Sequence, residues 1–164
     1  MTSSLHIILA ILFLCITSRA DLISDVCSKS VDPAFCTRTL RTDPAARAAP
    51  DLRSLGRVVV VRAKSAARVV VYVSASVGGQ IGGTCVETSR DAIDNLNESS
   101  KALRRPGRVA VGDLQTKASA ALSDVATCDD EYEDSGRPEP AKLKAATAKA
   151  QGIISILLVI ANQL

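Results

Sequence analysis

The chain has 164 residues, which is enough for one domain with a hydrophobic core. Its residues are 47% hydrophobic but only 2% aromatic, so the core is aliphatic, a composition that suits close-packed helices better than a large ligand cavity. Twenty basic and 17 acidic residues give a net charge of +3, which lacks the dense positive charge of a nucleic-acid-binding protein, so we expect no nucleic-acid partner.

The first 20 residues are typical of a secretory signal peptide. An apolar run extends from Ile7 to Ile16 and is too short to span a membrane. Ser18 and Ala20 are small residues at the two positions that a signal peptidase reads. We predict a signal peptide over residues 1–20, a mature domain over residues 21–164, and no membrane attachment after cleavage. Cys15 and the single histidine, His6, leave with the peptide.

The mature chain then keeps the cysteines Cys27, Cys36, Cys85 and Cys128. An even number of cysteines in an oxidising compartment predicts two disulfides, and spacing alone leaves three pairings open. Without histidine, and with its thiols paired, the mature chain lacks the groups for Ser-His-Asp or Cys-His catalysis and for a histidine zinc site. We therefore expect neither of these catalytic arrangements and no metal site.

Residues 21–50 contain two or three short pieces interrupted by prolines. Cys27 and Cys36 lie on either side of Pro33, an arrangement that suits a small helical hairpin closed on itself. We therefore expect an N-terminal hairpin that precedes the main part of the domain.

Residues 51–77 are rich in valine, which favours a strand by residue preference. A half-buried strand would alternate apolar and polar residues, and this segment does not. We predict one helix from Asp51 to Val77, with a pair of strands as the alternative. Its core stripe, spaced by three and four residues, is Leu52, Leu55, Val59, Ala63, Ala66, Val70, Val73 and Val77. A second stripe is basic, and it either keeps the helix soluble or contacts an anionic surface: Arg53, Arg57, Lys64 and Arg68.

Three further segments show the same helical spacing. Their core stripes are Cys85, Thr88, Ala92, Leu96, Ser99 and Leu103; then Val111, Leu114, Ala118, Ala121, Val125, Cys128 and Tyr132; then Leu143, Ala146, Ala150, Ile153, Leu157, Ile160 and Leu164. We interpret the last segment as too short for a membrane span. Residues 51–164 are therefore predicted to form an all-α antiparallel four-helix bundle. Cys85 and Cys128 lie on the stripes of adjacent helices, which favours the pairs Cys27–Cys36 and Cys85–Cys128.

Four stretches resemble successive segments of one known family. They are "DVCSKSVDPAFCTRTL", "LRTDPAARAAPDLRSLG", "GGTCVETSRDAIDNLNESSKAL" and "LQTKASAALSDVATCDDEY". Their order and spacing resemble the plant invertase and pectin methylesterase inhibitors over essentially the whole mature chain. The resemblance implies a four-helix bundle with an N-terminal hairpin, the same two disulfides, and secretion to the plant cell wall or delivery to the vacuole.

The resemblance also implies 1:1 non-covalent inhibition of a carbohydrate-active enzyme, with no catalysis and no cofactor. Invertase-directed members often carry Pro-Lys-Phe in the turn before the fourth-cysteine helix, where this chain has Val111-Gly112-Asp113. We therefore expect pectin methylesterase as the target, with cell-wall or vacuolar acid invertase as the alternative. A non-inhibitory structural or pollen protein of the same fold is a further alternative. A hydrophobic-ligand carrier would need a cavity, which the alanine-rich stripes disfavour.

An acidic patch is the candidate target-enzyme interface. Its members are Glu87, Asp91 and Asp94 on one helix face, with Thr127 and Asp130 near the fourth cysteine. A rigid helix pair that lies across a pectin-binding groove would present these carboxylates where those of pectin would sit, although an ordinary solvated face shows the same pattern. Separately, Asn97-Glu98-Ser99 is a glycosylation sequon, so Asn97 is a candidate glycosylation site.

Overall fold

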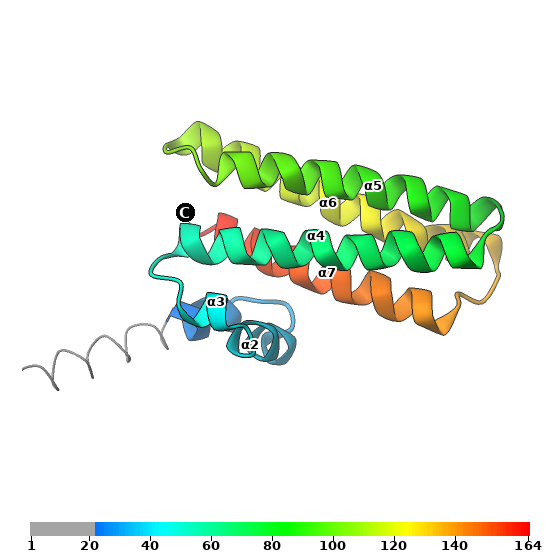
Figure 1. Cartoon of the computed structure of the whole chain (residues 1–164), viewed down its shortest axis with the longest axis horizontal. Coiled ribbons are helices and arrows are strands. Elements are labelled where there is room, and N and C mark those ends of the chain that lie inside the picture. The colour runs from blue at the N-terminus through cyan, green and yellow to red at the C-terminus, as the bar shows by residue number, and fades with distance from the viewer. Residues whose placement is uncertain (1–21) are drawn as a thin grey trace, which may run out of the picture.

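The computed structural model describes residues 22–164, and the predicted signal peptide over residues 1–20 lies outside the described residues. Four long helices dominate the fold, and successive helices run in opposite directions (Figure 1). They are α4 (Leu52–Val77), α5 (Gly79–Ala102), α6 (Arg108–Ser135) and α7 (Ala141–Ala161). The predicted all-α antiparallel four-helix bundle is therefore confirmed.

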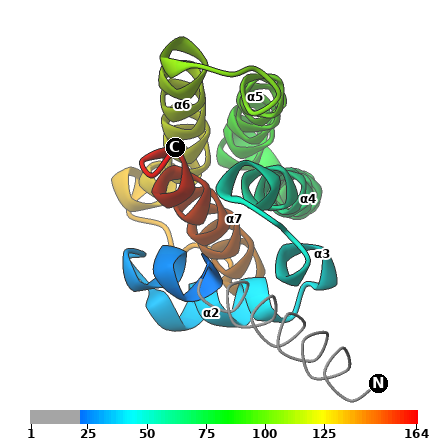
Figure 2. The same cartoon turned by 90° about the vertical axis from the view of Figure 1, so that its left-hand side faces the viewer.

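The four helices form a ring in which each packs against two neighbours. α5 lies between α4 and α6, and α7 closes the ring by packing against both α4 and α6. In the view along the bundle, α5 and α6 form one side of the molecule (Figure 2). The N-terminal hairpin lies on the opposite side and packs below α4 and α7. The bundle thus has an α5–α6 side and an α4–α7 side.

The valine-rich segment is a single helix, as predicted, and Asp51 caps it. The Asp51 carboxylate accepts a hydrogen bond from the backbone nitrogen of Ser54 at 2.7 Å, which satisfies one of the free N–H groups at the helix start. Gly78 and Gly79 then link α4 to α5 with φ angles of 67° and 70°, a left-handed region that glycine adopts without strain.

The predicted core stripe of α4 is correct in its centre and wrong at its C-terminal end. Leu55, Val59, Ala63, Ala66 and Val70 are buried, but Val77 is 39% exposed because it lies in the terminal turn beside the link to α5. The buried face is also wider than the stripe, since α4 packs against α5 on one flank and α7 on the other. It additionally contains Gly56, Val60, Ala67 and Ser74.

The stripes of the other three helices are buried almost throughout. The exceptions are Thr88 and Val111, which are half-buried, and Leu164, which follows the last helical turn and is exposed. α7 has 21 residues and is long and apolar enough to cross a membrane by length and composition, so our interpretation that it is too short for a membrane span was wrong. Ten of its residues are nevertheless buried in the bundle, which is how a core helix behaves.

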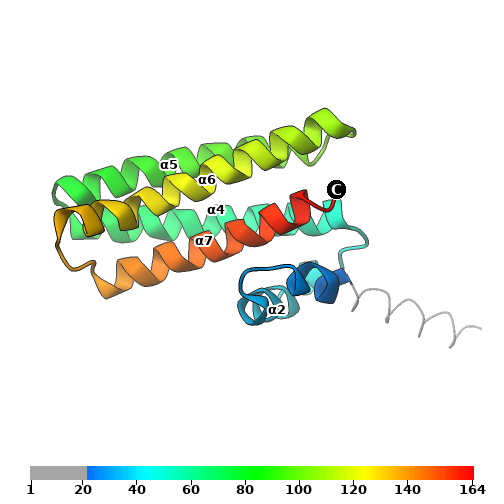
Figure 3. The same cartoon turned by 180° about the vertical axis from the view of Figure 1, so that it is seen from behind.

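The N-terminal hairpin consists of a helical segment over residues 22–28, then α2 (Pro33–Arg41) and α3 (Pro44–Arg47). Asp32 and Asp43 cap α2 and α3, and each is followed by a proline in the first helical turn. The Cys27–Cys36 disulfide closes the hairpin. Seen from behind, the hairpin lies along α7 (Figure 3), where the ring of Phe35 packs over Gly152.

Candidate functional site

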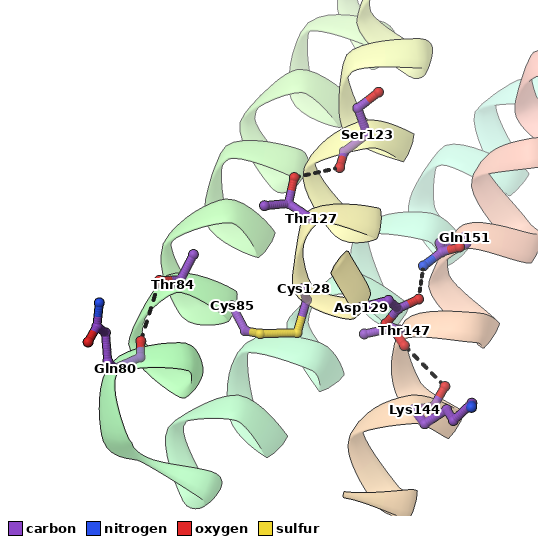
Figure 4. The surroundings of a disulfide bond; sticks show 10 residues. All are labelled: Gln80, Thr84, Cys85, Ser123, Thr127, Cys128, Asp129, Lys144, Thr147 and Gln151. Carbon is purple, nitrogen blue, oxygen red and sulfur yellow. Dashed lines mark hydrogen bonds between the residues drawn. A yellow bond between two sulfur atoms is a disulfide. The ribbon is translucent and has the colours of Figure 1, made fainter. Parts of the chain in front are cut away.

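The α5–α6 pair is held together by close packing and by a covalent bond. Cys85 of α5 and Cys128 of α6 are fully buried and form a disulfide with their Cα atoms 4.8 Å apart (Figure 4). Many of the buried residues of the two helices are small, which lets the two backbones approach closely; they include Ser89, Ala92, Ala118 and Ala121. The pair is therefore a stiff platform for the side chains on its outer surface.

Polar side chains from both helices meet along the contact between them, which we call the α5–α6 seam. Asn95 of α5 donates a hydrogen bond through Nδ2 to Oδ2 of Asp124 on α6, at 2.9 Å. Lys117 of α6 donates through Nζ to Oδ1 of Asn95, at 3.4 Å. By helical spacing, the same flanks carry Thr84, Thr88 and Asp91 on α5, and Thr127 and Glu131 on α6.

Asp124 is the most electrostatically perturbed group of the seam. Its burial between the helices, together with the negative charge of Asp91, raises its pKa, while the hydrogen bond from Asn95 works in the opposite direction. Thr88 adds a second unusual group, because its buried Oγ1 has no hydrogen-bond partner among the described residues. The seam therefore combines a concentrated negative charge with an unused hydroxyl group.

The structure places the predicted interface residues on the outer surface of this helix pair. Glu87, Asp91 and Asp94 are exposed along α5, and Asp130 is exposed on α6. Thr127 is half-buried, and its hydroxyl donates a hydrogen bond to the backbone oxygen of Ser123 at 3.0 Å (Figure 4). Of the five residues, Asp91 and Thr127 lie on the flanks of the seam, and the charge of Asp91 acts on Asp124.

Our sequence reasoning missed Asn95, Lys117 and Asp124, which link the two helices. A signal was present, because Lys117, Asp124 and Thr127 follow one another at helical intervals on a single flank of α6. The spacing does not show whether this flank of α6 faces α5 or α7. The role of these residues can therefore be assigned only when the packing of the helices is known.

Charge is strongly segregated between the two sides of the bundle. α5 and α6 together carry eleven acidic and four basic side chains. α4 and α7 together carry eight basic side chains and no acidic one. The modest net charge of the whole chain therefore conceals an acidic side and a basic side.

Two further sequence features have defined places in the fold. Asn97, the candidate glycosylation site, lies inside α5, where its Oδ1 accepts a hydrogen bond from Lys64 Nζ at 3.3 Å. Residues 111–113, expected in a turn, lie inside the first turns of α6, where Asp113 forms an ion pair with Arg105 at 2.6 Å. Within residues 22–164, no group of three histidine, cysteine or acidic residues is arranged to hold a metal ion.

Comparison with known proteins gives consistent matches. The model of a family described as "Plant invertase/pectin methylesterase inhibitor" matches residues 21–160. A "Pectinesterase inhibitor" from Actinidia deliciosa is 33% identical over 152 residues, which are 87% of this chain and 79% of that protein. "Pectinesterase inhibitor 2" from Arabidopsis thaliana is 27% identical over 153 residues, which are 87% of this chain and 83% of that protein.

Solved structures agree with the sequence matches. The crystal structure of mutant form A of a pectin methylesterase inhibitor from Arabidopsis has a TM-score of 0.74 and 25% identity, and the match covers 87% of this chain and 96% of that one. The crystal structure of a pectin methylesterase inhibitor from Arabidopsis thaliana has a TM-score of 0.62 and 26% identity, and the match covers 87% and 95% of the two chains.

Proposed function

The chain belongs to the plant invertase/pectin methylesterase inhibitor family, and we propose that it is a secreted inhibitor of pectin methylesterase. Members of this family are inhibitors of enzymes and not enzymes themselves. We further propose that residues 1–20 direct secretion, that the mature chain acts in the cell wall, and that it forms a 1:1 complex over the active-site cleft of its target.

The observation that carries the proposal for the binding face is the acidic, disulfide-tied α5–α6 pair. An enzyme that acts on pectin must accommodate a chain bearing carboxylates, so its groove favours negative charge. The exposed carboxylates of Glu87, Asp91 and Asp94 lie along one face of α5, held on a rigid support by the Cys85–Cys128 bond. Rigid carboxylates reach such a groove without the entropy loss that ordering a flexible loop would require.

Acid invertase is the competing target. The residues at the position of the Pro-Lys-Phe motif, 111–113, are helical here, and Asp113 is paired with Arg105. A helical, ion-paired segment does not offer the projecting turn that invertase-directed members would insert into the enzyme. This difference supports pectin methylesterase as the target.

The test is a titration of the oxidised mature chain, residues 21–164, against pectin methylesterase and acid invertase. We expect stoichiometric loss of esterase activity and no comparable loss of invertase activity. Asp94→Lys and Asp130→Lys should each weaken esterase inhibition about tenfold or more, since each replaces a carboxylate with a positive charge at a groove that favours negative charge. Asp25→Lys makes the same charge change on the N-terminal hairpin and should leave inhibition unchanged.

Two results would contradict the proposal. If neither enzyme loses activity at micromolar inhibitor, the chain is a non-inhibitory member of the family. If Asp25→Lys weakens inhibition as strongly as the two α5–α6 substitutions, the acidic face is not the binding surface.

A further inference from the structure

The α4–α7 side of the bundle carries an exposed apolar ridge on α4. Val61, Val69 and Tyr72 are 62%, 50% and 76% exposed, and helical spacing places them on one face together with Ser65. We call Val61, Ser65, Val69 and Tyr72 the valine ridge. Soluble proteins expose single apolar side chains often, but a row of them along one helix is unusual and indicates a contact surface.

Cationic side chains border the valine ridge on both sides. Arg57 and Arg68 are exposed along one edge of α4. On the other edge, Lys149 of α7 lines a groove with Val61, Ser65 and Val69. The ridge is therefore a strip of apolar surface with Arg57 and Arg68 on one edge and Lys149 on the other.

Arg68 and Lys149 form no ion pair within the described part of the chain. The ion pair that α4 makes there joins Arg62 to Asp43 of the hairpin. Arg57 forms no ion pair there either, although its charge helps to lower the pKa of nearby Asp51. Because neither α4 nor α7 contains an acidic residue, no rearrangement within these two helices can neutralise these cations. An external anion fits this surface.

We propose that the α4–α7 side binds a linear acidic polysaccharide, a polyuronate such as de-esterified pectin. α4 is a rod of 26 residues, roughly 39 Å long, which matches an extended polymer better than a compact ligand. The apolar faces of the sugar rings pack on Tyr72 and the valines, and the uronate carboxylates pair with Arg57, Arg68 and Lys149. This site lies on the side of the bundle opposite the proposed enzyme-binding face, so it goes beyond the inhibition and does not depend on it.

The ridge suits a polysaccharide better than an anionic membrane. Helices that lie in a membrane interface insert long or bulky apolar side chains such as Trp, Phe and Leu. The exposed apolar side chains of α4 are valines and one tyrosine, and its leucines, Leu52 and Leu55, face the bundle. Short valine side chains form a shallow surface that a sugar chain can lie on but that inserts little into lipid.

Native affinity electrophoresis of the oxidised mature chain tests the proposal without any enzyme. Gels that contain polygalacturonate should retard the protein, gels that contain fully methyl-esterified pectin should not, and added salt should reduce the retardation. Arg57→Gln/Arg68→Gln/Lys149→Gln should weaken binding about tenfold or more, and Tyr72→Ser should weaken it several-fold. Arg90→Gln/Arg104→Gln/Arg108→Gln removes the same charge elsewhere and should change binding by less than about twofold.

The outcomes separate this proposal from its competitors and from the inhibitor function. Loss of polygalacturonate binding in both triple variants would show that binding depends only on the net charge of the protein. That result would overturn the proposed site. Absence of retardation, or co-sedimentation with vesicles of phosphatidylcholine and phosphatidylglycerol in place of polygalacturonate binding, would also overturn it. The first triple variant should still inhibit pectin methylesterase, and its thermal unfolding should match that of the wild type.

Discussion

The carboxyl group of Glu139, in the link between α6 and α7, lies within hydrogen-bonding reach of the carboxylate of Asp129 on α6. One oxygen of Asp129 accepts a hydrogen bond from Gln151 of α7 at 2.7 Å (Figure 4). Asp129 Oδ1 and Glu139 Oε1 are buried and have no donor among the described residues. A proton on the Glu139 carboxyl group, donated to Asp129, would satisfy both oxygens at once.

We predict that this pair makes stability depend on pH. Burial, followed by the charge of Asp129, raises the pKa of Glu139 above its ordinary value of 4.5, and nearby Lys144 only partly opposes this. The Glu139 carboxyl group therefore holds its proton more tightly in the folded state than in the unfolded state. The resulting stabilisation is complete below pH 4.5 and is lost as the pH rises through the folded-state pKa. The wild-type melting temperature should fall as the pH rises from 4.5 through the folded-state pKa of Glu139.

Thermal unfolding of Glu139→Gln across the same pH range checks this prediction. The glutamine amide can donate to Asp129 at every pH, so the fall in melting temperature should be smaller than in the wild type. Part of the fall in melting temperature should remain in this variant, because the pKa of Asp124 is also raised. Exposed Glu133→Gln serves as the control and should follow the wild-type profile; a flattening as large as that of Glu139→Gln would contradict the assignment.

The two disulfides should contribute unequally to stability. The loop closed by Cys85–Cys128 spans 43 residues and that closed by Cys27–Cys36 spans nine. Loop-closure entropy then predicts a loss of about 4 kcal/mol for Cys85→Ala/Cys128→Ala and about 2.6 kcal/mol for Cys27→Ala/Cys36→Ala. Denaturant unfolding of the two double variants measures both losses. An equal loss, or a larger one for the hairpin, would mean that native packing and not chain entropy dominates.

Two glycines inside helices should respond oppositely to alanine. A Cβ atom at Gly152 would lie 2.8 Å from the ring of Phe35, so Gly152→Ala must displace the hairpin and should cost about 1–3 kcal/mol. A Cβ atom at Gly112 meets nothing within 4 Å, so Gly112→Ala should stabilise α6 by about 0.5–1 kcal/mol. Hydrogen exchange of α2 should increase only in the Gly152 variant. If both substitutions stabilise the protein, the Phe35 ring must move away from a Cβ atom at position 152 without cost.

The sequence predicts the bundle well because each helix has one wide apolar face. In α6, the predicted stripe from Leu114 to Tyr132 is buried as expected, since alanine, leucine and valine recur there at helical intervals. In α4 the pattern is less decisive, because valines occur all round the helix. Spacing alone therefore did not identify Val60 as buried or Val77 as exposed.

The functional groups were harder to predict, because they depend on contacts between elements. Asp124 and Asn95 belong to different helices, and each is an ordinary polar surface residue until the two helices are docked. Glu139 lies in a link with no periodic pattern, so its contact with Asp129 leaves no signal in the sequence. Helical spacing in the sequence identifies the faces of each helix. Only the folded structure shows which faces of different helices contact one another.

Buried and exposed valines on α4 allow a matched comparison of two substitutions. Val70 is fully buried and Val61 is 62% exposed. Val70→Asp places an unpaired carboxylate in the core and should cost more than about 3 kcal/mol, a large part of the stability of a small domain. Val61→Lys should change the unfolding free energy by no more than about 0.5 kcal/mol, because lysine forms helices at least as well as valine and its charge stays in water.

Circular dichroism during thermal unfolding measures both variants, and a peptide of residues 51–77 completes the comparison. We expect that peptide to be largely non-helical in water, because valine lowers intrinsic helix propensity and helix initiation is costly without partner helices. Burial of the valines stabilises α4 by roughly 1.5 kcal/mol or more for each side chain, and only the folded bundle supplies that burial. Equal effects of Val70→Asp and Val61→Lys, or a helical isolated peptide, would mean that α4 does not depend on the bundle as its packing indicates.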